Sequence, residues 1–278
     1  MENEPFHAAG QISGNDISNF RESGYLALPG VLSPSEVCES RQALTELVEA
    51  YAALSPSQRN DADLWLQFEP GFDPDTCHDR EALELHVRKF MRFVDLKPAL
   101  KRLVEPSHRL MQIVSQLIGP DPILFQDMAL VKPPFIGSEK PWHQDNAYFS
   151  VAPLDSVCGV WIALDDATVD NGCMYVIPGW HKRGALGHHH GTDCEIAARK
   201  LPVEEAVPVP IAAGGAMFFY GMLPHQTPPN TSPARRRALQ YHFRGANSRV
   251  LGGEEYDRLY ADETGAPASC AAARARGV

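Results

Sequence analysis

Three residues in the middle of the chain have the types and spacing of a metal site. His143 and Asp145 are separated by one residue, Gln144, and His225 follows much later in the chain. In an extended strand, residues two apart point to the same face, so His143 and Asp145 could reach one ion. Two imidazole nitrogens and one carboxylate oxygen leave the opposite coordination positions open, which suits non-haem Fe(II) that also binds a cosubstrate and O2. Because the chain has 11 His, an isolated His-x-Asp carries little weight, and the surrounding elements have to support it.

The N-terminal portion of the chain is predicted to be mostly helical. Residues 33–36, Ser-Pro-Ser-Glu, form a capping-box signal with Pro at the first helical position, and the helix that they open should end before Pro56. Residues 55–80 hold several Pro and Gly among polar residues and are expected to form an irregular loop. A second helical stretch is expected near 99–118.

From about residue 121 the apolar pattern changes from helical spacing to strand-like runs separated by turn signals. The predicted strands are 123–131, 157–164, 173–177, 216–220 and 238–243. Helices first and short strands afterwards predict helices that buttress an antiparallel barrel or sandwich.

Alternation within two of these strands indicates a barrel that holds a ligand inside. In each strand one face is small or polar with a single large group, and the other is uniformly apolar. The first set is Val157, Gly159, Trp161 and Ala163, then Arg236, Ala238, Gln240 and His242; the second set is Cys158, Val160, Ile162 and Leu164, then Leu239, Tyr241 and Phe243. By the same parity, Arg235 and Arg237 should point outward into solvent.

The composition of the chain limits which cellular compartment and which classes of partner we expect. The formal net charge is −10, and the only basic run is 235–237, so nucleic acid is not an expected partner. No apolar stretch is long enough for a membrane span, and no secretory signal is visible. Six scattered cysteines without Cys-x-x-Cys spacing do not suggest a disulfide framework. We predict a cytoplasmic protein that acts on a small molecule, and the oligomeric state stays open.

Several further stretches occur in a fixed order around the three candidate ligands. They are residues 20–32, 132–135, 141–145, 160–167 and 171–182, then His225, Arg236 and His242-Phe243. In this order they resemble the phytanoyl-CoA dioxygenase family, one of the Fe(II)/2-oxoglutarate oxygenases. The resemblance implies a mainly β fold with flanking helices, a double-stranded β-helix (jelly-roll, cupin-like) barrel buttressed by N-terminal helices. We expect one oxygenase domain over 1–278, with a mostly helical N-terminal region over residues 1–120, a jelly-roll core over 121–250 and a C-terminal tail over 251–278, which should be frayed from Gly265 onward.

The resemblance also implies roles for individual residues. Iron would be held by His143, Asp145 and His225, which would be the catalytic centre. Arg236 would anchor the distal carboxylate of 2-oxoglutarate, since a guanidinium grips a carboxylate through two parallel hydrogen bonds. Further cosubstrate contacts are expected from Thr227, Trp161, Gln126 and Met128. The presence of Asp145 favours hydroxylation or another oxidation, because family members that halogenate lack this carboxylate.

Substrate contacts are expected from loops over the open end of the barrel, at 64–92, 146–155 and 180–200. The candidate side chains in them are Tyr148, Phe149, Trp180 and His188. The net negative charge and the absence of a basic rim argue against an acyl-CoA ester, whose phosphates would need Lys and Arg.

The sequence therefore favours an Fe(II)- and 2-oxoglutarate-dependent dioxygenase that hydroxylates or otherwise oxidises a small or medium organic molecule, releasing succinate and CO2. Two alternatives stay open: a cupin-like metal-binding protein without turnover, and a metalloenzyme on the same barrel that does not use 2-oxoglutarate. Arg236 argues against the binding protein, because a pure binder needs no cosubstrate anchor.

Overall fold

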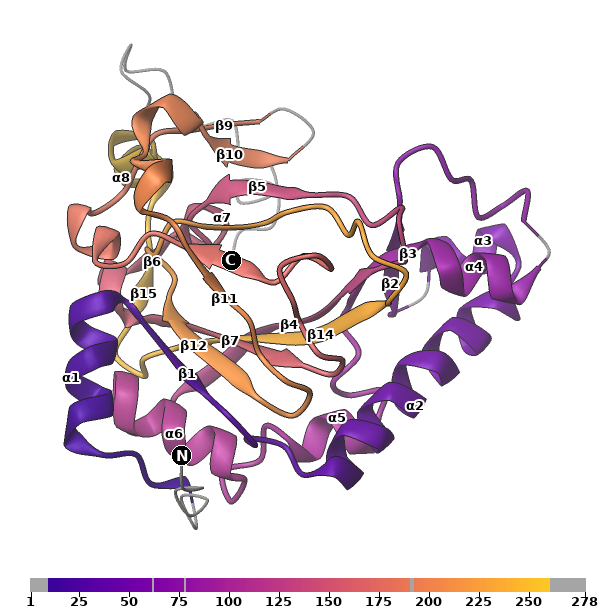
Figure 1. Cartoon of the computed structure of the whole chain (residues 1–278), viewed down its shortest axis with the longest axis horizontal. Helices are drawn as coiled ribbons and strands as arrows, with labels where there is room; N and C mark the ends of the chain where they lie inside the picture. Colours follow the sequence, from indigo (N-terminus) through magenta and orange to yellow (C-terminus); the bar gives the residue numbers. More distant parts are fainter. Residues whose placement is uncertain (1–9, 62, 78, 191–192, 261–278) are drawn as a thin grey trace.

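Two antiparallel sheets face each other in the computed structural model, which describes residues 10–61, 63–77, 79–190 and 193–260 (Figure 1). The larger sheet has, in spatial order, β1 (Tyr25–Leu28), β12 (Ala216–Tyr220), β7 (Val157–Ala163), β14 (Arg236–Arg244), β4 (Ile123–Lys132), β3 (Val87–Met91) and β2 (Trp65–Phe68). The smaller sheet has β11 (Val207–Val209), β8 (Met174–Val176), β13 (His225–Thr227) and β5 (Lys140–His143). Two facing sheets connected in this way form a jelly-roll, as predicted.

Shorter elements complete the fold. Two-stranded sheets are formed by β9 (His188–His190) with β10 (Cys194–Ile196), and by β6 (Val151–Ala152) with β15 (Arg249–Val250). The helices are α1 (Gly14–Ser23), α2 (Pro34–Ala52), α3 (Pro56–Asp61), α4 (Arg80–His86), α5 (Pro98–Arg102), α6 (Arg109–Ile118), α7 (Asn146–Phe149) and α8 (Gly253–Tyr260). Short 3-10 turns occupy Leu154–Ser156, Trp180–Arg183, Ala198–Lys200 and Val203–Glu205.

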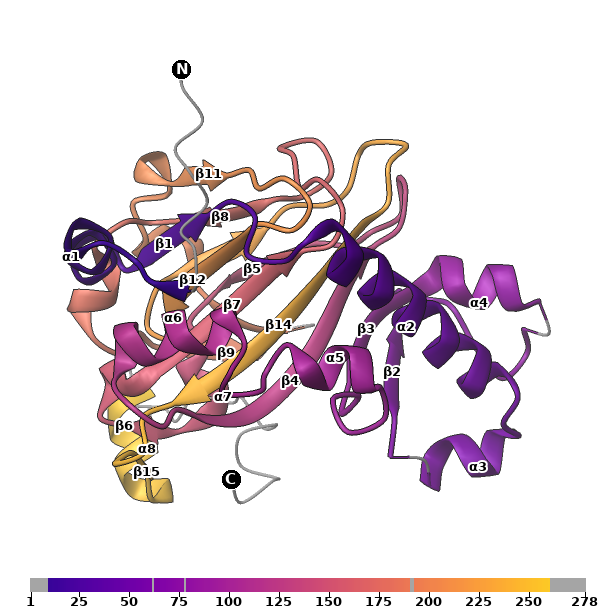
Figure 2. The same ribbon diagram turned by 90° about the horizontal axis from the view of Figure 1, so that it is seen from below.

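Helices α2, α5 and α6 cover the outer face of the larger sheet (Figures 1 and 2). The predicted capping box is present at α2, where Ser33 and Glu36 bond each other's backbone N–H groups. The predicted helix at 99–118 is wrong in its continuity, because the chain leaves the helix after α5 and begins α6 only after Pro106. Proline lacks the N–H that a continuous helix would use.

The region predicted as an irregular loop, 55–80, needs correction as well. It contains α3 and β2, and β2 pairs with β3 to extend the larger sheet beyond β4. Figure 2 shows this extension beside α2 and α4. The first 120 residues therefore supply three strands of the larger sheet in addition to the helices.

The two faces of the central strands separate as their alternation predicts. Trp161, Ala163 and Ala238 pack between the two sheets, whereas Val160, Ile162, Leu239 and Tyr241 pack with the helices. Gly159 leaves space for the ring of Phe219, since a Cβ there would lie 2.4 Å from Phe219 Cζ. That ring in turn packs on His225, with 4.9 Å between ring centroids, so a core glycine helps to position a candidate ligand.

Arg235 and Arg237 do not line the cavity between the sheets, consistent with the parity argument, but they are not free in solvent. Arg235 pairs with Glu84 at 2.9 Å. Arg237 makes two parallel bonds to the Asp165 carboxylate, from Nε at 2.8 Å and from an Nη at 2.9 Å. The expectation of solvated arginines was wrong because acidic partners lie on this side of the sheet, Glu84 in α4 and Asp165 shortly after β7.

Other expectations concern the termini, the cysteines and membranes. Helix α8 packs on α7, where the Tyr256 hydroxyl donates to the Ala147 carbonyl at 2.6 Å, and the expectation for the tail from Gly265 lies outside the described residues. Cys38, Cys77, Cys158 and Cys173 are free thiols, whereas Cys194 is disulfide-bonded. Within the described regions of the chain, no helix has the length and apolarity needed to cross a membrane. The cytoplasmic location stays a prediction.

Candidate metal centre

The strand that carries His143 ends at that residue, and the chain turns directly into α7. Asp145 has helical backbone angles, with φ −60° and ψ −36°. The expectation that His143 and Asp145 share one face of an extended strand was therefore wrong in its geometry. The carboxylate reaches the imidazole because the backbone bends into the first turn of a helix.

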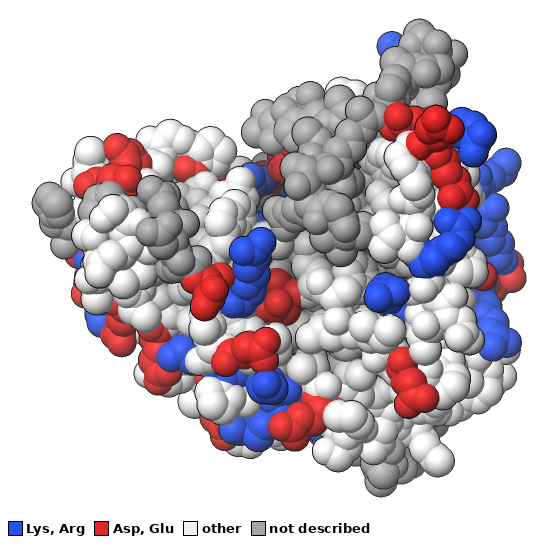
Figure 3. All heavy atoms as spheres, turned by 180° about the vertical axis from the view of Figure 1, so that it is seen from behind, with Lys and Arg blue, Asp and Glu red and all other residues white. Residues whose placement is uncertain are grey.

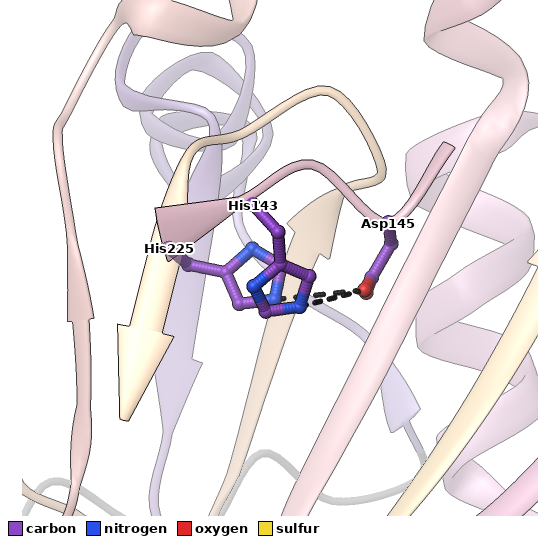
Figure 4. Close-up of side chains that lie close together, drawn as sticks. All are labelled: His143, Asp145 and His225. Carbon is purple, nitrogen blue, oxygen red and sulfur yellow. Dashed lines mark ion pairs between the residues drawn. The ribbon is translucent and has the colours of Figure 1, made fainter. Parts of the chain in front are cut away.

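His143, Asp145 and His225 nevertheless converge, with one ligand atom of each within 4.8 Å of the others (Figure 4). Asp145 Oδ1 lies 3.3 Å from His143 Nε2 and 3.6 Å from His225 Nε2. His143 and His225 sit opposite each other in the pairing of β5 with β13. All three side chains are buried. Because a buried carboxylate and two imidazoles are ordinary ligands of a divalent transition metal, the donor set fits such an ion.

Backbone carbonyls fix the tautomer of both histidines. His143 Nδ1 lies 2.8 Å from the Pro141 carbonyl oxygen, and His225 Nδ1 lies 2.9 Å from the Leu223 carbonyl oxygen. A carbonyl can only accept, so each Nδ1 carries the proton and each Nε2 keeps its lone pair. Both lone pairs therefore face Asp145 Oδ1 and the space between the rings, where a metal would be bound.

The second oxygen of Asp145 is held from β14. Asp145 Oδ2 accepts from His242 Nε2 at 2.8 Å and from Gln240 Nε2 at 3.2 Å. His242 Nδ1 is buried without a partner among the described residues, as expected if its proton is on Nε2. The two donors leave only Oδ1 available to an ion, so Asp145 would bind through one oxygen.

Gln144, the residue between the two ligands, joins this turn to the loop before β9. Its side-chain nitrogen donates to the Met222 carbonyl at 2.7 Å and to the Gly184 carbonyl at 2.9 Å, and its oxygen accepts from Leu186 N at 2.9 Å. Its backbone N–H donates to His188 Nε2 at 3.0 Å. These bonds fix the backbone between His143 and Asp145 from behind.

Burial sets the charge of the three candidate ligands. Burial, with a smaller contribution from His225, lowers the pKa of His143 to about 3, and burial also lowers the pKa of His225. Burial opposes ionisation of Asp145, but His225, His242 and the hydrogen bonds outweigh it and hold the pKa of that carboxyl well below its usual value. At neutral pH the site thus presents two neutral imidazoles and one carboxylate, the protonation state in which they bind a metal.

A cavity that is partly open to solvent is lined by the triad, and the empty space in it together with its solvent-filled mouth is about 800 Å³. Four of the predicted cosubstrate residues line it: Arg236, Thr227, Gln126 and Met128. The fifth, Trp161, is fully buried beneath the Arg236 guanidinium, 5.4 Å from the guanidinium carbon to the ring centroid. The five residues thus lie together although they are far apart in the chain, and their contacts with a cosubstrate stay a prediction.

Arg236 is a buried cation without an acidic partner among the described residues. Its Nε has no hydrogen-bond partner there, and one Nη donates weakly to the Leu130 carbonyl at 3.5 Å. Burial lowers the pKa of Arg236 to about 10, so the group is still charged at neutral pH. Since an unpaired buried charge is unfavourable, this side chain is suited to an anionic ligand.

The predicted substrate residues divide into two pairs. Tyr148 and Phe149 line the cavity. His188 and Trp180 do not, and both nitrogens of His188 are occupied, Nδ1 by the Leu186 carbonyl and Nε2 by the Gln144 N–H. The role expected for His188 was wrong because the histidine supports the ligand turn from behind. Trp180 packs beside Trp142 and Ile177.

The sequence reading missed four charged side chains at the cavity. Arg88 and Lys89 come from β3, Lys140 begins β5, and Asp193 precedes β10. The first two lie in a segment without a recognised strand, and Lys140 precedes the His-x-Asp motif. Gln240 and His242 could have been found, because they share the strand face of Arg236.

Comparison with known proteins agrees with this geometry. The family model described as phytanoyl-CoA dioxygenase matches residues 20–238. A relative from Danio rerio, phytanoyl-CoA dioxygenase domain-containing protein 1, is 28% identical over 274 residues, with 88% of this chain and 94% of the relative covered. Phytanoyl-CoA dioxygenase 1 of Oryza sativa subsp. japonica is 30% identical over 254 residues, with coverage of 84% and 89%.

Among solved structures, EvdO2 from Micromonospora carbonacea var. aurantiaca is similar to this chain. The two align with a TM-score of 0.67 and 26% identity, over 89% of this chain and 96% of that one. The same protein has been solved in complex with 2-oxoglutarate.

Acid should destabilise the metal-free protein through His143. Because its pKa is lowered on folding, the folded state binds fewer protons than the unfolded state between about pH 6.5 and the folded value. The contribution of this pKa shift to the free energy of unfolding is therefore fully present above about pH 6.5 and is lost as the pH falls. We expect His143→Gln to reduce the slope of unfolding free energy against pH by up to about 1.4 kcal/mol per pH unit between about pH 6 and 4.5. Urea unfolding measures this, and equal slopes would contradict it.

Removing the support of Asp145 should weaken metal binding without removing a ligand. We expect His242→Ala to raise the Kd for Fe(II) or Mn(II) by about 10–100-fold, the usual effect of losing a partner of a ligand. His242→Gln should recover some of the loss, because its amide N–H can donate to Asp145. As a control, His181→Ala should bind metal like the parent protein. Anaerobic titration gives the Kd values, and an unchanged Kd in His242→Ala would refute the role of this residue.

Proposed function

The chain belongs to the phytanoyl-CoA dioxygenase family, and on that premise we propose that it is an Fe(II)- and 2-oxoglutarate-dependent dioxygenase. It hydroxylates or otherwise oxidises a small or medium organic substrate and releases succinate and CO2. One observation carries the proposal: a triad with two bare imidazole nitrogens shares its cavity with a buried arginine that has no acidic partner among the described residues.

The triad residues would hold the iron. His143 and His225 supply Nε2 atoms whose lone pairs are free, and Asp145 supplies Oδ1. When iron and 2-oxoglutarate are bound, they supply oxidative decarboxylation of the oxoacid coupled to oxidation of the substrate. One atom of O2 enters succinate and the other is available to the substrate. The protein contributes the positions of the reactants and the exclusion of water.

Arg236 would bind the distal carboxylate of 2-oxoglutarate. Its guanidinium lines the cavity and has a free Nε–H, so a carboxylate can accept two bonds from it. Thr227 adds a hydroxyl two residues after His225, and Met128 and Trp161 contribute apolar surface. Gln126, whose amide oxygen is buried without a partner in the described chain, would turn toward the bound ligands.

Lys89 would supply a second positive charge to the dianionic cosubstrate. It lines the cavity from β3, opposite Leu130 in the strand pairing, and no ion pair or hydrogen bond of its ammonium group occurs in the described residues. Burial lowers the pKa of Lys89 to about 8, so its amine is mostly in the protonated, positively charged form at neutral pH. An anionic ligand would therefore raise its pKa again.

Arg236 argues against a cupin-like metal-binding protein without turnover, because such a protein needs no cosubstrate anchor. A metalloenzyme that does not use 2-oxoglutarate could bind another anion at Arg236, so succinate formation is what distinguishes it. These alternatives also predict no succinate.

The proposal is tested by succinate formation. We expect the parent protein with Fe(II) and ascorbate to convert 2-oxoglutarate to succinate slowly without substrate, and Asp145→Ala to lose this turnover. Arg236→Gln should weaken the binding of 2-oxoglutarate by about 2–5 kcal/mol, because one partner of a buried charge pair is removed. This corresponds to an increase of at least about thirtyfold in the KM for 2-oxoglutarate.

Arg235→Gln and Arg237→Gln are the matched controls, since their side chains pair with Glu84 and Asp165 away from the cavity. Their KM for 2-oxoglutarate should stay within about twofold of the parent value, within the usual effect of a remote surface charge. Equal increases in KM at all three arginines, or succinate from Asp145→Ala at the parent rate, would refute the proposal.

A further inference from the structure

A second group of cations lies at the cavity, apart from Arg236. Lys140 Nζ bonds the Tyr148 hydroxyl at 2.7 Å and Asp193 Oδ1 at 2.8 Å. One Nη of Arg88 bonds Asp193 Oδ2 and the Glu139 carbonyl oxygen, both at 3.0 Å. Arg88 and Lys140 therefore share one carboxylate, and both line the cavity.

This group has unused hydrogen-bond donors. An ammonium group has three donors and a guanidinium has five. Lys140 uses two of them on Tyr148 and Asp193, and Arg88 uses only one of its three nitrogens in the described residues. The second Nη and Nε of Arg88 are thus available to a further acceptor. The side chains of both cations are largely covered, with 15% exposed for Arg88 and 26% for Lys140.

The charges of the loaded cavity do not balance. The two positive charges of Fe(II) are balanced by the two negative charges of the 2-oxoglutarate dianion. Of the lining side chains, Arg88, Lys89, Lys140 and Arg236 are positive, and Asp145 and Asp193 are negative. Lys132 is left out because burial lowers its pKa to about 6. With iron and 2-oxoglutarate bound, the cavity therefore has a net charge of +2. One of these two charges comes from Arg88 and Lys140, which share the single negative charge of Asp193.

This surplus is a property of the cavity and not of the whole surface. The chain has a formal net charge of −10. On the face in Figure 3, the described Lys and Arg side chains are mixed with Asp and Glu. An acidic protein that concentrates cations in one partly buried cavity creates a local positive potential there, which attracts anions.

We propose that the substrate oxidised at this site carries an anionic group, a carboxylate or a phosphate, and that Lys140 and Arg88 bind it at the cavity. This rests on the proposed function, because the count assumes bound iron and 2-oxoglutarate. Tyr148 holds Lys140 in place, and its own hydroxyl is fixed by Cys194 N at 3.2 Å. The sequence argument against an acyl-CoA ester assumed the absence of a basic rim, whereas Arg88 of β3 and Lys140 of β5 place basic groups at the cavity.

The test uses four probes that share a six-carbon chain: hexanoate, hexyl phosphate, hexanol and hexylamine. Each is titrated by calorimetry under anaerobic conditions into protein loaded with Fe(II) and saturating 2-oxoglutarate, so that Arg236 is occupied. We expect at least one anionic probe to bind about tenfold or more tightly than hexanol, the usual effect of charge-assisted hydrogen bonds. Hexylamine should not bind. Comparison of hexanoate with hexyl phosphate identifies the preferred group.

Variants assign the binding to the two cations. Lys140→Gln and Arg88→Gln should each raise the Kd for the anionic probe by about tenfold or more. Lys140→Arg should keep much of the parent affinity, because it keeps the positive charge. The Kd for 2-oxoglutarate should stay within about twofold in all three, which also shows that they fold. Lys182→Gln, whose ion pair with Glu22 lies outside the cavity, is the control and should bind every probe like the parent.

Three results would overturn the inference: hexanol binds as tightly as the anions, no anionic probe binds at millimolar concentration, or both Gln variants bind the anion normally. Failure of the proposed function gives a different result. In that case the parent protein with Fe(II) would not bind 2-oxoglutarate or form succinate, and the inference would fall with it.

Discussion

The site depends on one carboxylate, that of Asp145, whose two oxygens have different roles. Asp145 presents Oδ1 to the two histidines, while His242 and Gln240 hold Oδ2. If both oxygens were free, Asp145 could occupy two coordination positions, and the space for a chelating cosubstrate and O2 would shrink. The single available oxygen is a consequence of β14 lying beneath the ligand turn. A strand of the larger sheet thus determines the coordination offered by the smaller one.

The rest of the local structure keeps that carboxylate in place. The turn from β5 into α7 puts Asp145 beneath the imidazoles, and Gln144 ties the turn to the loop before β9. His188 completes the support by accepting the Gln144 N–H. Because each of these groups is buried and hydrogen-bonded, small displacements would leave polar atoms without partners. The arrangement favours a site that is already formed before a metal binds.

Much of this could be predicted from the sequence, for identifiable reasons. Strand alternation separated Arg236 and Gln240 from Leu239 and Tyr241, since that pattern is local and has a period of two. The geometry at Asp145 could not be predicted, because the backbone change from strand to helix is set by contacts of Gln144 with distant segments. Arg88 and Lys89 were missed for a related reason. Their strand forms by pairing with β4, and its own sequence contains few of the usual strand signals.

The most direct test is a crystal structure of the protein grown anaerobically with Fe(II) and 2-oxoglutarate. We predict iron bound by Nε2 of His143 and of His225 and by one oxygen of Asp145, with the other oxygen still bonded to His242. The distal carboxylate of 2-oxoglutarate should lie against the guanidinium of Arg236. Iron bound by both Asp145 oxygens, or 2-oxoglutarate bound away from Arg236, would contradict this description of the site.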